Sequence, residues 1–205
     1  MVTRSKSNKK QSPDATQLLL DELKEIYSAE SQLSRAVPRL SKAVESETLK
    51  KMLDTRLEQG ERLIDDLEQA FEALNASPGR RKNAAAEGLI AEAREHVQEL
   101  GQGFALDAVL IGALQKLEHY CIAAWGTAKS LAQAASQKQI VTAMERALDE
   151  GKQVDTEMTR MAESEIIPAL LSMSGEAEEG EEEEDKTTGG RGKSAGSSSD
   201  RHVSH

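Results

Sequence analysis

The chain has 205 residues, a net charge of −10 at pH 7 and only 2% aromatic residues. This acidity argues against a general nucleic-acid-binding protein, so we expect no nucleic-acid partner for the folded core. No apolar run is long enough to span a membrane, the basic N-terminus lacks the apolar stretch of a secretion signal, and Cys121 is the only cysteine. We therefore expect a cytoplasmic protein without membrane contact or a disulfide framework.

Residues 1–13 are polar, contain four basic side chains and predict a disordered basic arm. The first long helix is expected over residues 14–44, where apolar residues recur in steps of four and three. Glu30 lies at the centre of this apolar face, and a buried carboxylate is costly unless it is paired or binds a metal. Pro38 lies near the end of the helix and is expected to kink or weaken its last turns.

The second long helix is expected over residues 46–74. Its apolar face is interrupted by Arg56, Gln59 and Gly60, at positions where leucine would be expected. Glycine inside a helix costs about 1 kcal/mol relative to alanine, so Gly60 indicates a close helix approach or a lost side chain.

A turn-rich loop over residues 75–83 and a short helix over 84–100 separate the second long helix from the third. The third and fourth helices are expected over 104–134 and 136–171, with Pro168 near the end. A plain up-and-down bundle uses short connections, whereas one long crossover is typical of ferritin-like proteins. The sequence therefore predicts an all-α fold: a ferritin-like four-helix bundle with a crossover helix between the second and third long helices.

Residues 174–205 are rich in glutamate, then glycine and serine, and predict a disordered tail. The bundle is accordingly expected over residues 14–173. His202 and His205 in the tail are interpreted as incidental rather than as a metal site.

The apolar faces of the long helices meet in a central layer that contains Glu30, Gln59, Gly60, Cys121 and Gly151. Ferritin-like di-metal sites need a glutamate from each of two helices and Glu-x-x-His from each of the others. No Glu-x-x-His occurs at mid-helix. The residues by themselves predict a bundle with one buried acid and no catalytic or cofactor-binding residue.

Several segments resemble the YciE/YciF family, a ferritin-like family of stress-associated bacterial proteins. The matching segments are residues 18–33, 57–72, 87–91, 116–127 and 148–155. The most specific one is Glu118-His119-Tyr120 followed, after one residue, by Ile-Ala-Ala-Trp-Gly-Thr. The resemblance spans about residues 14–171 and implies a dimeric helical bundle with a ferritin-type metal site.

The chain departs from the family pattern in the central layer. Gln59 and Gly60 stand where the family usually has Glu and Thr, and Leu63 stands where Gln or His is common. Cys121 and Gly151 each replace a glutamate. Three acidic positions of one layer therefore read Gln, Cys and Gly, which indicates loss of the metal site as a unit.

One hypothesis is a bundle that binds no metal or binds it weakly. Arg56 lies on the face where the family often carries histidine, and we predict that it forms an ion pair with Glu30 in place of the metal. Alternatively, Arg56 extends along the surface to solvent.

A second hypothesis is a residual site for iron, manganese or zinc that is built from Glu30 and Glu118. Three further residues are possible additional ligands: His119, Cys121 and Glu150. The competing interpretations are that Cys121 is a small buried hydrophobic residue and that His119 is an ordinary surface histidine.

Taken together, the sequence predicts a stress-associated bundle with a degenerate di-metal site and a structural or binding role. A protein without enzymatic activity is favoured over an enzyme. By resemblance it is a homodimer with unknown protein partners. The alternative is a di-iron or manganese oxidase or a peroxide-detoxifying protein.

Overall fold

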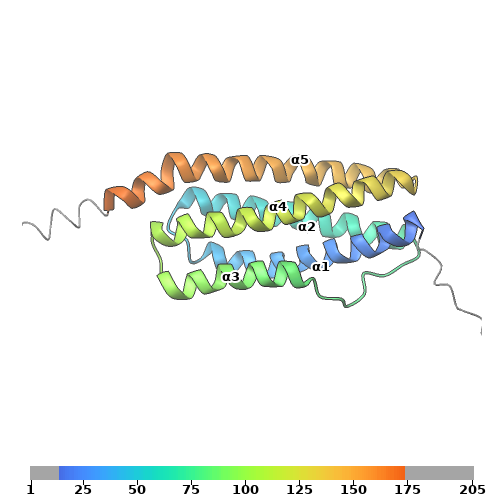
Figure 1. Cartoon of the computed structure of the whole chain (residues 1–205), viewed down its shortest axis with the longest axis horizontal. Coiled ribbons are helices and arrows are strands. Elements are labelled where there is room, and N and C mark those ends of the chain that lie inside the picture. The colour runs from blue at the N-terminus through green and yellow to red at the C-terminus, as the bar shows by residue number, and fades with distance from the viewer. Residues whose placement is uncertain (1–13, 174–205) are drawn as a thin grey trace, which may run out of the picture. The chain divides into compact units, whose positions relative to one another are not determined.

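The structure is a computed structural model that describes residues 14–173; the predicted arm and tail lie outside this range. The chain divides into a unit of residues 1–168 and a unit of 169–205, and in the second unit the described residues 169–173 are helical. Helices form the first unit (Figure 1): α1 (Ala15–Ser41), α2 (Glu47–Ala73), α3 (Ala84–Leu100), α4 (Phe104–Ala134), α5 (Lys138–Met161) and a π-helical turn (Ala162–Ile166).

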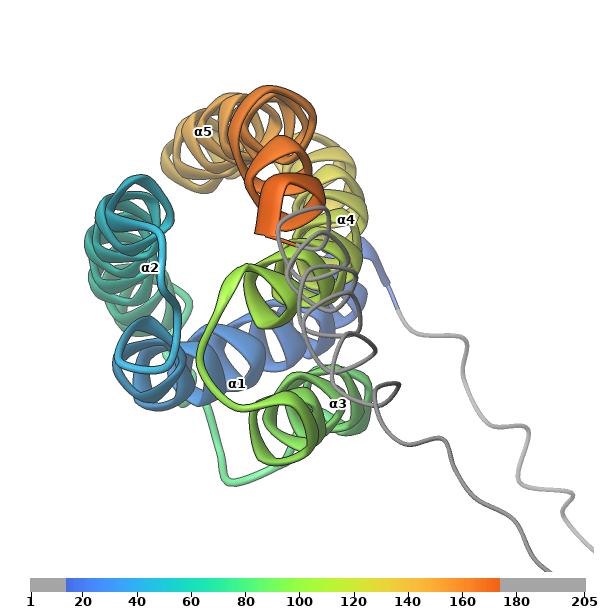
Figure 2. The same cartoon turned by 90° about the vertical axis from the view of Figure 1, so that its left-hand side faces the viewer.

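Within residues 14–168, four long helices enclose one hydrophobic core. Figure 2 shows their arrangement in an end-on view. α1 packs against α2 and α4, while α5 packs against α4 and α2. α3 lies outside the bundle against α1 and α4. This arrangement confirms the predicted ferritin-like bundle with a crossover helix.

Local sequence signals begin and end the helices. Asp14, Ser46 and Asn83 precede α1, α2 and α3, and each side chain accepts a hydrogen bond from a backbone N–H of the first turn. Asn75 and Ser136 follow α2 and α4 with φ of 50° and 58°. This left-handed conformation stops a helix, and it explains why α5 begins at Lys138 rather than at the predicted residue 136.

The helices continue past both prolines, as the sequence predicted. Pro38 lies inside α1, which continues to Ser41. Helical residues extend past Pro168 to residue 173. A proline removes a single backbone donor, so it weakens a helix without necessarily ending it.

A group of hydrogen bonds around Asp107, called here the Asp107 clasp, fixes the direction of α4. It consists of Asp107, Glu45, Ser46 and Glu165. Asp107, in the first turn of α4, accepts hydrogen bonds from the backbone N–H groups of Glu45 (2.9 Å) and Ser46 (2.7 Å). The Ser46 hydroxyl donates to Glu165 in the π-helical turn (2.6 Å). Burial raises the pKa of Asp107, although these two backbone N–H groups favour its charged form. The clasp brings the starts of α2 and α4 together, so the two helices run parallel and need a crossover between them.

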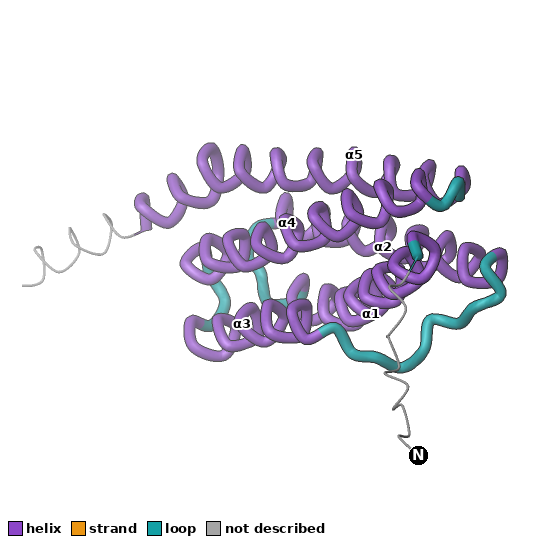
Figure 3. Tube along the Cα trace, turned by 45° about the vertical axis from the view of Figure 1, so that its right-hand side comes forward, coloured by secondary structure: helices purple, strands orange, loops and turns teal. Residues whose placement is uncertain are grey.

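The crossover begins with the loop of residues 74–83, which runs outside the long helices to α3 (Figure 3). Asn83 anchors the end of this loop because its side chain donates to the Glu25 carbonyl (3.1 Å) and to the Tyr120 hydroxyl (2.5 Å). Gln32 donates to the Asn83 carbonyl (3.0 Å). In the described part of the chain, no helix combines the length and the apolar character needed to cross a membrane.

Candidate functional site

Arg56 forms a buried ion-pair cluster with glutamates from two other helices. Its Nη2 lies 3.1 Å from Glu30 Oε1, and its Nη1 lies 3.2 Å from Glu30 Oε2. Its Nε donates to Glu118 Oε2 at 2.7 Å. The guanidinium from α2 therefore binds Glu30 of α1 through two nitrogens and Glu118 of α4 through the third.

The cluster is removed from solvent. The exposed fractions of the side chains are 6% for Arg56, 1% for Glu30 and 4% for Glu118. The ring of Trp125 lies 5.5 Å from the Arg56 guanidinium carbon, within the range of a cation–π contact. Arg56 thus does not extend to solvent, which was the alternative interpretation.

Two glycines leave space for these side chains. A Cβ atom at Gly60 would lie 3.0 Å from Glu30 Oε2 and 3.1 Å from Arg56 Nη1. A Cβ at Gly151 of α5 would lie 2.5 Å from Trp125 Cζ3 and 2.6 Å from Glu118 Oε1. The missing side chain at Gly60 therefore makes room for the charged groups, and that at Gly151 makes room for Glu118 and Trp125.

One guanidinium faces two carboxylates, and burial affects the protonation of Glu118. Burial raises the pKa of Glu118, and Arg56 opposes this only in part. Burial alone would lower the pKa of Arg56, but Glu30 and Glu118 reverse the effect and raise it. Glu118 Oε1 is buried and makes no hydrogen bond within the described chain. These features shift Glu118 toward its neutral form, compared with a glutamate in water.

The other candidate ligands of the sequence analysis lie in different surroundings. Cys121 is buried, and burial, followed by the charge of Glu30, raises the pKa of its thiol. His119 is exposed and lies 3.1 Å from Asp155. Glu150 pairs with Arg62 at 3.0 Å. The structure thus brings Cys121 next to the cluster and leaves His119 and Glu150 engaged elsewhere.

A ferritin-type metal does not fit the residues present. The guanidinium of Arg56 lies between the carboxylates of Glu30 and Glu118 and engages both oxygens of Glu30. A metal would need those oxygens as ligands, and it would need Cys121 as a thiolate, which the raised pKa disfavours. Over residues 14–173, no three His, Cys, Asp or Glu side chains are grouped in a way that could hold a metal ion.

From the sequence, Arg56 was expected to pair with Glu30 alone; its contacts with Glu118 and Trp125 were not expected. Leu114, Glu118, Cys121 and Trp125 follow one another in steps of four, three and four. This spacing places all four on one face of α4, and it could have identified Glu118 as a second buried partner.

Fold and site together define the class: an all-α ferritin-like bundle with a crossover helix and a buried arginine–glutamate cluster at its centre. The chain belongs to the family described as "Domain of unknown function (DUF892)", which matches residues 14–170.

Relatives support this membership and confirm the YciE/YciF resemblance. Protein YciF of Escherichia coli (strain K12) is 36% identical over 141 residues, which are 68% of this chain and 85% of YciF. The crystal structure of the E. coli stress protein YciF matches with a TM-score of 0.70 and 34% identity, over 74% of this chain and 96% of that one.

Two further solved structures are similar. YcfI of Rhodopseudomonas palustris, proposed to be a structural protein, matches with a TM-score of 0.68 and 32% identity, over 75% of this chain and 96% of that one. A protein of Xanthomonas campestris pv. campestris matches with a TM-score of 0.62 at 16% identity, over 78% of this chain and 98% of that one, which shows a common fold alone.

Proposed function

We propose that this protein is a stress-associated bundle with a structural or partner-binding role, and that Arg56 replaces a metal at its centre. The observation that carries the proposal is the engagement of both Glu30 oxygens and one Glu118 oxygen by a single guanidinium. Two relatives support the role: one is described as a stress protein and the other is proposed to be a structural protein.

The cluster has little capacity for catalysis. Oxidase or peroxide chemistry at a carboxylate-bound metal requires oxygen ligands that are free to coordinate and a position open to substrate. Here the carboxylates are held by Arg56, and the nearby Cys121 is buried with a raised pKa, which disfavours the reactive thiolate. The alternative function, a di-iron or manganese oxidase or peroxide-detoxifying protein, would require Arg56 to leave this position.

The proposal includes a cytoplasmic homodimer that binds other proteins. The resemblance to a family of dimeric bundles supports self-association.

Metal content tests the proposal. The full chain, purified without a chelator, is expected to contain iron, manganese and zinc far below one ion per chain by elemental analysis. A ferritin-like protein with a known di-metal site, prepared in parallel, controls for metal loss during purification. Near-stoichiometric iron or manganese in this chain would contradict the proposal.

A further inference from the structure

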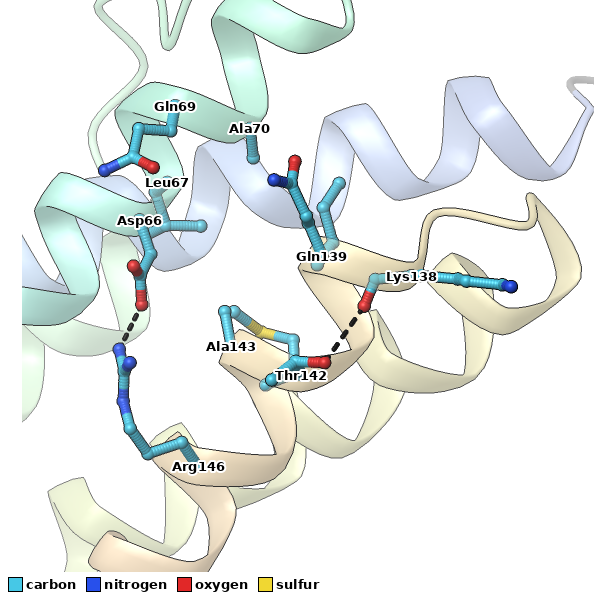
Figure 4. Close-up of a pocket in the computed structure, with 11 residues that line it drawn as sticks. Asp66, Leu67, Gln69, Ala70, Lys138, Gln139, Thr142, Ala143 and Arg146 are labelled. Atoms are coloured by element: carbon cyan, nitrogen blue, oxygen red, sulfur yellow. Dashed lines mark hydrogen bonds and ion pairs between the residues drawn. The ribbon is translucent and has the colours of Figure 1, made fainter.

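The four long helices do not close equally tightly on all sides. A groove of about 340 Å³ lies between the second half of α2 and the first turns of α5 (Figure 4). Its lining includes Leu67 and Ala70 of α2 and Ala143 and Met144 of α5. Alanine side chains reach only a short distance, so the two helices leave space between them here.

A second, smaller cavity continues along the same side. It has about 10 Å³, room for roughly one water molecule, and it is lined by Arg56, Leu63, Trp125 and Gly151 among others. Arg146 lines both cavities. The α2–α5 seam, defined here by the linings of these two cavities, thus extends from the end of the bundle to the buried cluster.

Ion pairs near the surface cross this seam. Arg146 of α5 pairs with Asp66 of α2 (Figure 4), and Arg62 of α2 pairs with Glu150 of α5 at 3.0 Å. The side chains of Arg62 and Arg146 are 50% and 43% exposed. Exposed pairs of this kind contribute little to stability and are screened by salt.

From this arrangement we propose that the α2–α5 seam is a salt-sensitive gate to the buried cluster. Opening breaks the Asp66–Arg146 and Arg62–Glu150 pairs and separates α2 from α5 at the cavities, while α5 keeps its packing on α4. Solvent and small solutes then reach Arg56 and its neighbours. The gate is independent of the proposed function, because it concerns access to the centre and not what the centre binds.

Cys121 is the only thiol of the chain, and it is buried within interaction range of Arg56, Glu30 and Glu118. It therefore reports on solvent access to the cluster. The rate at which a small thiol reagent modifies Cys121 in the full chain is measured at low and high salt. We expect the rate to rise with salt. We also expect an Arg62→Gln/Arg146→Gln variant to react roughly tenfold faster at low salt, the effect of losing two exposed ion pairs.

The matched control is Lys129→Gln/Arg160→Gln. It removes the same number of cations from two other ion pairs, Lys129–Glu145 between α4 and α5 and Arg160–Glu157 within α5. This variant is expected to react at the rate of the natural chain. Equal acceleration in both variants, or no acceleration in either, would overturn the gate.

Urea separates gate opening from global unfolding. Local opening exposes little surface, so below the unfolding transition the modification rate should depend only weakly on urea. A urea dependence as steep as that of global unfolding would show that Cys121 reacts only in the unfolded chain, and it would also overturn the proposal.

Discussion

Arg56 is a cation that the chain itself supplies. It differs from a metal ion because its planar guanidinium offers hydrogen bonds in fixed directions, and Glu30 and Glu118 lie along them. The cluster is therefore specific for its geometry as well as for its charge. Removing Arg56 leaves Glu30 and Glu118 buried without the donor groups that they contact, and this costs more free energy than the intact ion pairs contribute.

Arg56→Ala is expected to lower the free energy of unfolding by about 3–5 kcal/mol, because buried Glu30 loses its counter-charge and Glu118 loses its hydrogen-bond donor. For a chain of this size the melting temperature should fall by roughly 6–20 °C, measured by circular dichroism. Arg62→Ala, which removes an exposed arginine from the same helix, should change stability by about 0.5 kcal/mol or less. Similar melting temperatures for both variants would show that the guanidinium is not required.

The second prediction concerns the proton on Glu118. Its pKa in the folded chain is raised above the ordinary value of 4.5. Its contribution to stability is therefore fully present below about pH 4.5 and is lost as the pH rises through the folded-state pKa. Glu118→Gln cannot titrate but can still accept from Arg56 Nε, so this variant should lack that decline.

The measurement is the free energy of unfolding by urea from pH 4.5 upward for the natural chain and Glu118→Gln. The difference between them should shift in favour of the variant as the pH increases. Glu72→Gln, at an exposed position of α2, is the control and should follow the natural chain. Parallel curves for Glu118→Gln and the natural chain would mean that Glu118 is already ionised across this range.

At the scale of the helices, the spacing of apolar residues predicted which segments are helical. The predicted second, crossover and third helices agree with α2, α3 and α4 to within a residue at each end. The ends of the first and last helices were less predictable: α1 ends at Ser41 and α5 spans Lys138–Met161, whereas residues 44 and 136–171 were expected. Such ends depend on the backbone conformation of single residues, such as Ser136. The π-helical turn has no signal in the apolar spacing, and the Asp107 clasp joins residues far apart in the sequence.

The packing of α5 on α4 depends on the absence of a side chain at Gly151. Gly151→Ala should destabilise the bundle by about 1–3 kcal/mol, since its Cβ would overlap Trp125 and Glu118. Gly126→Ala is the matched change in α4, where a Cβ meets no atom within 4 Å. It should stabilise the helix by about 0.5–1 kcal/mol. Chemical denaturation of both variants tests the pair, and the same sign for both would refute this account.

For the whole molecule, the connectivity was predictable because the crossover segment is too long for a simple turn. The existence of a buried charge was also predictable, since Glu30 interrupts an apolar face and Arg56 stands where leucine would be expected. The geometry of the cluster was not predictable from the sequence, because it depends on how three helices are rotated and shifted along their axes relative to one another. Trp125 illustrates this: sequence spacing assigns it to a face of α4 but not to a position over Arg56.

The charge of the C-terminal segment should affect self-association of the proposed dimer. Residues 174–205 contain nine acidic and four basic residues, half of the net charge of −10. Removing them should strengthen dimerisation several-fold at low salt and have little effect at high salt, because repulsion is screened. Sedimentation equilibrium of the full chain and of residues 1–173 measures this. The same dissociation constant for both at low salt would show that residues 174–205 do not affect dimerisation.

The separation of the cluster along the chain has a consequence for biosynthesis. Glu30 precedes Arg56 by 26 positions, whereas Glu118 follows it by 62. On the ribosome, Arg56 can meet its first partner as soon as α1 and α2 emerge, but the second arrives only after the crossover has been translated. Gly151 of α5, which covers Glu118 and Trp125, is translated later still. Until α5 packs on the other helices, the charged side chains of Glu30, Arg56 and Glu118 therefore remain hydrated, and the packing of α5 removes them from water.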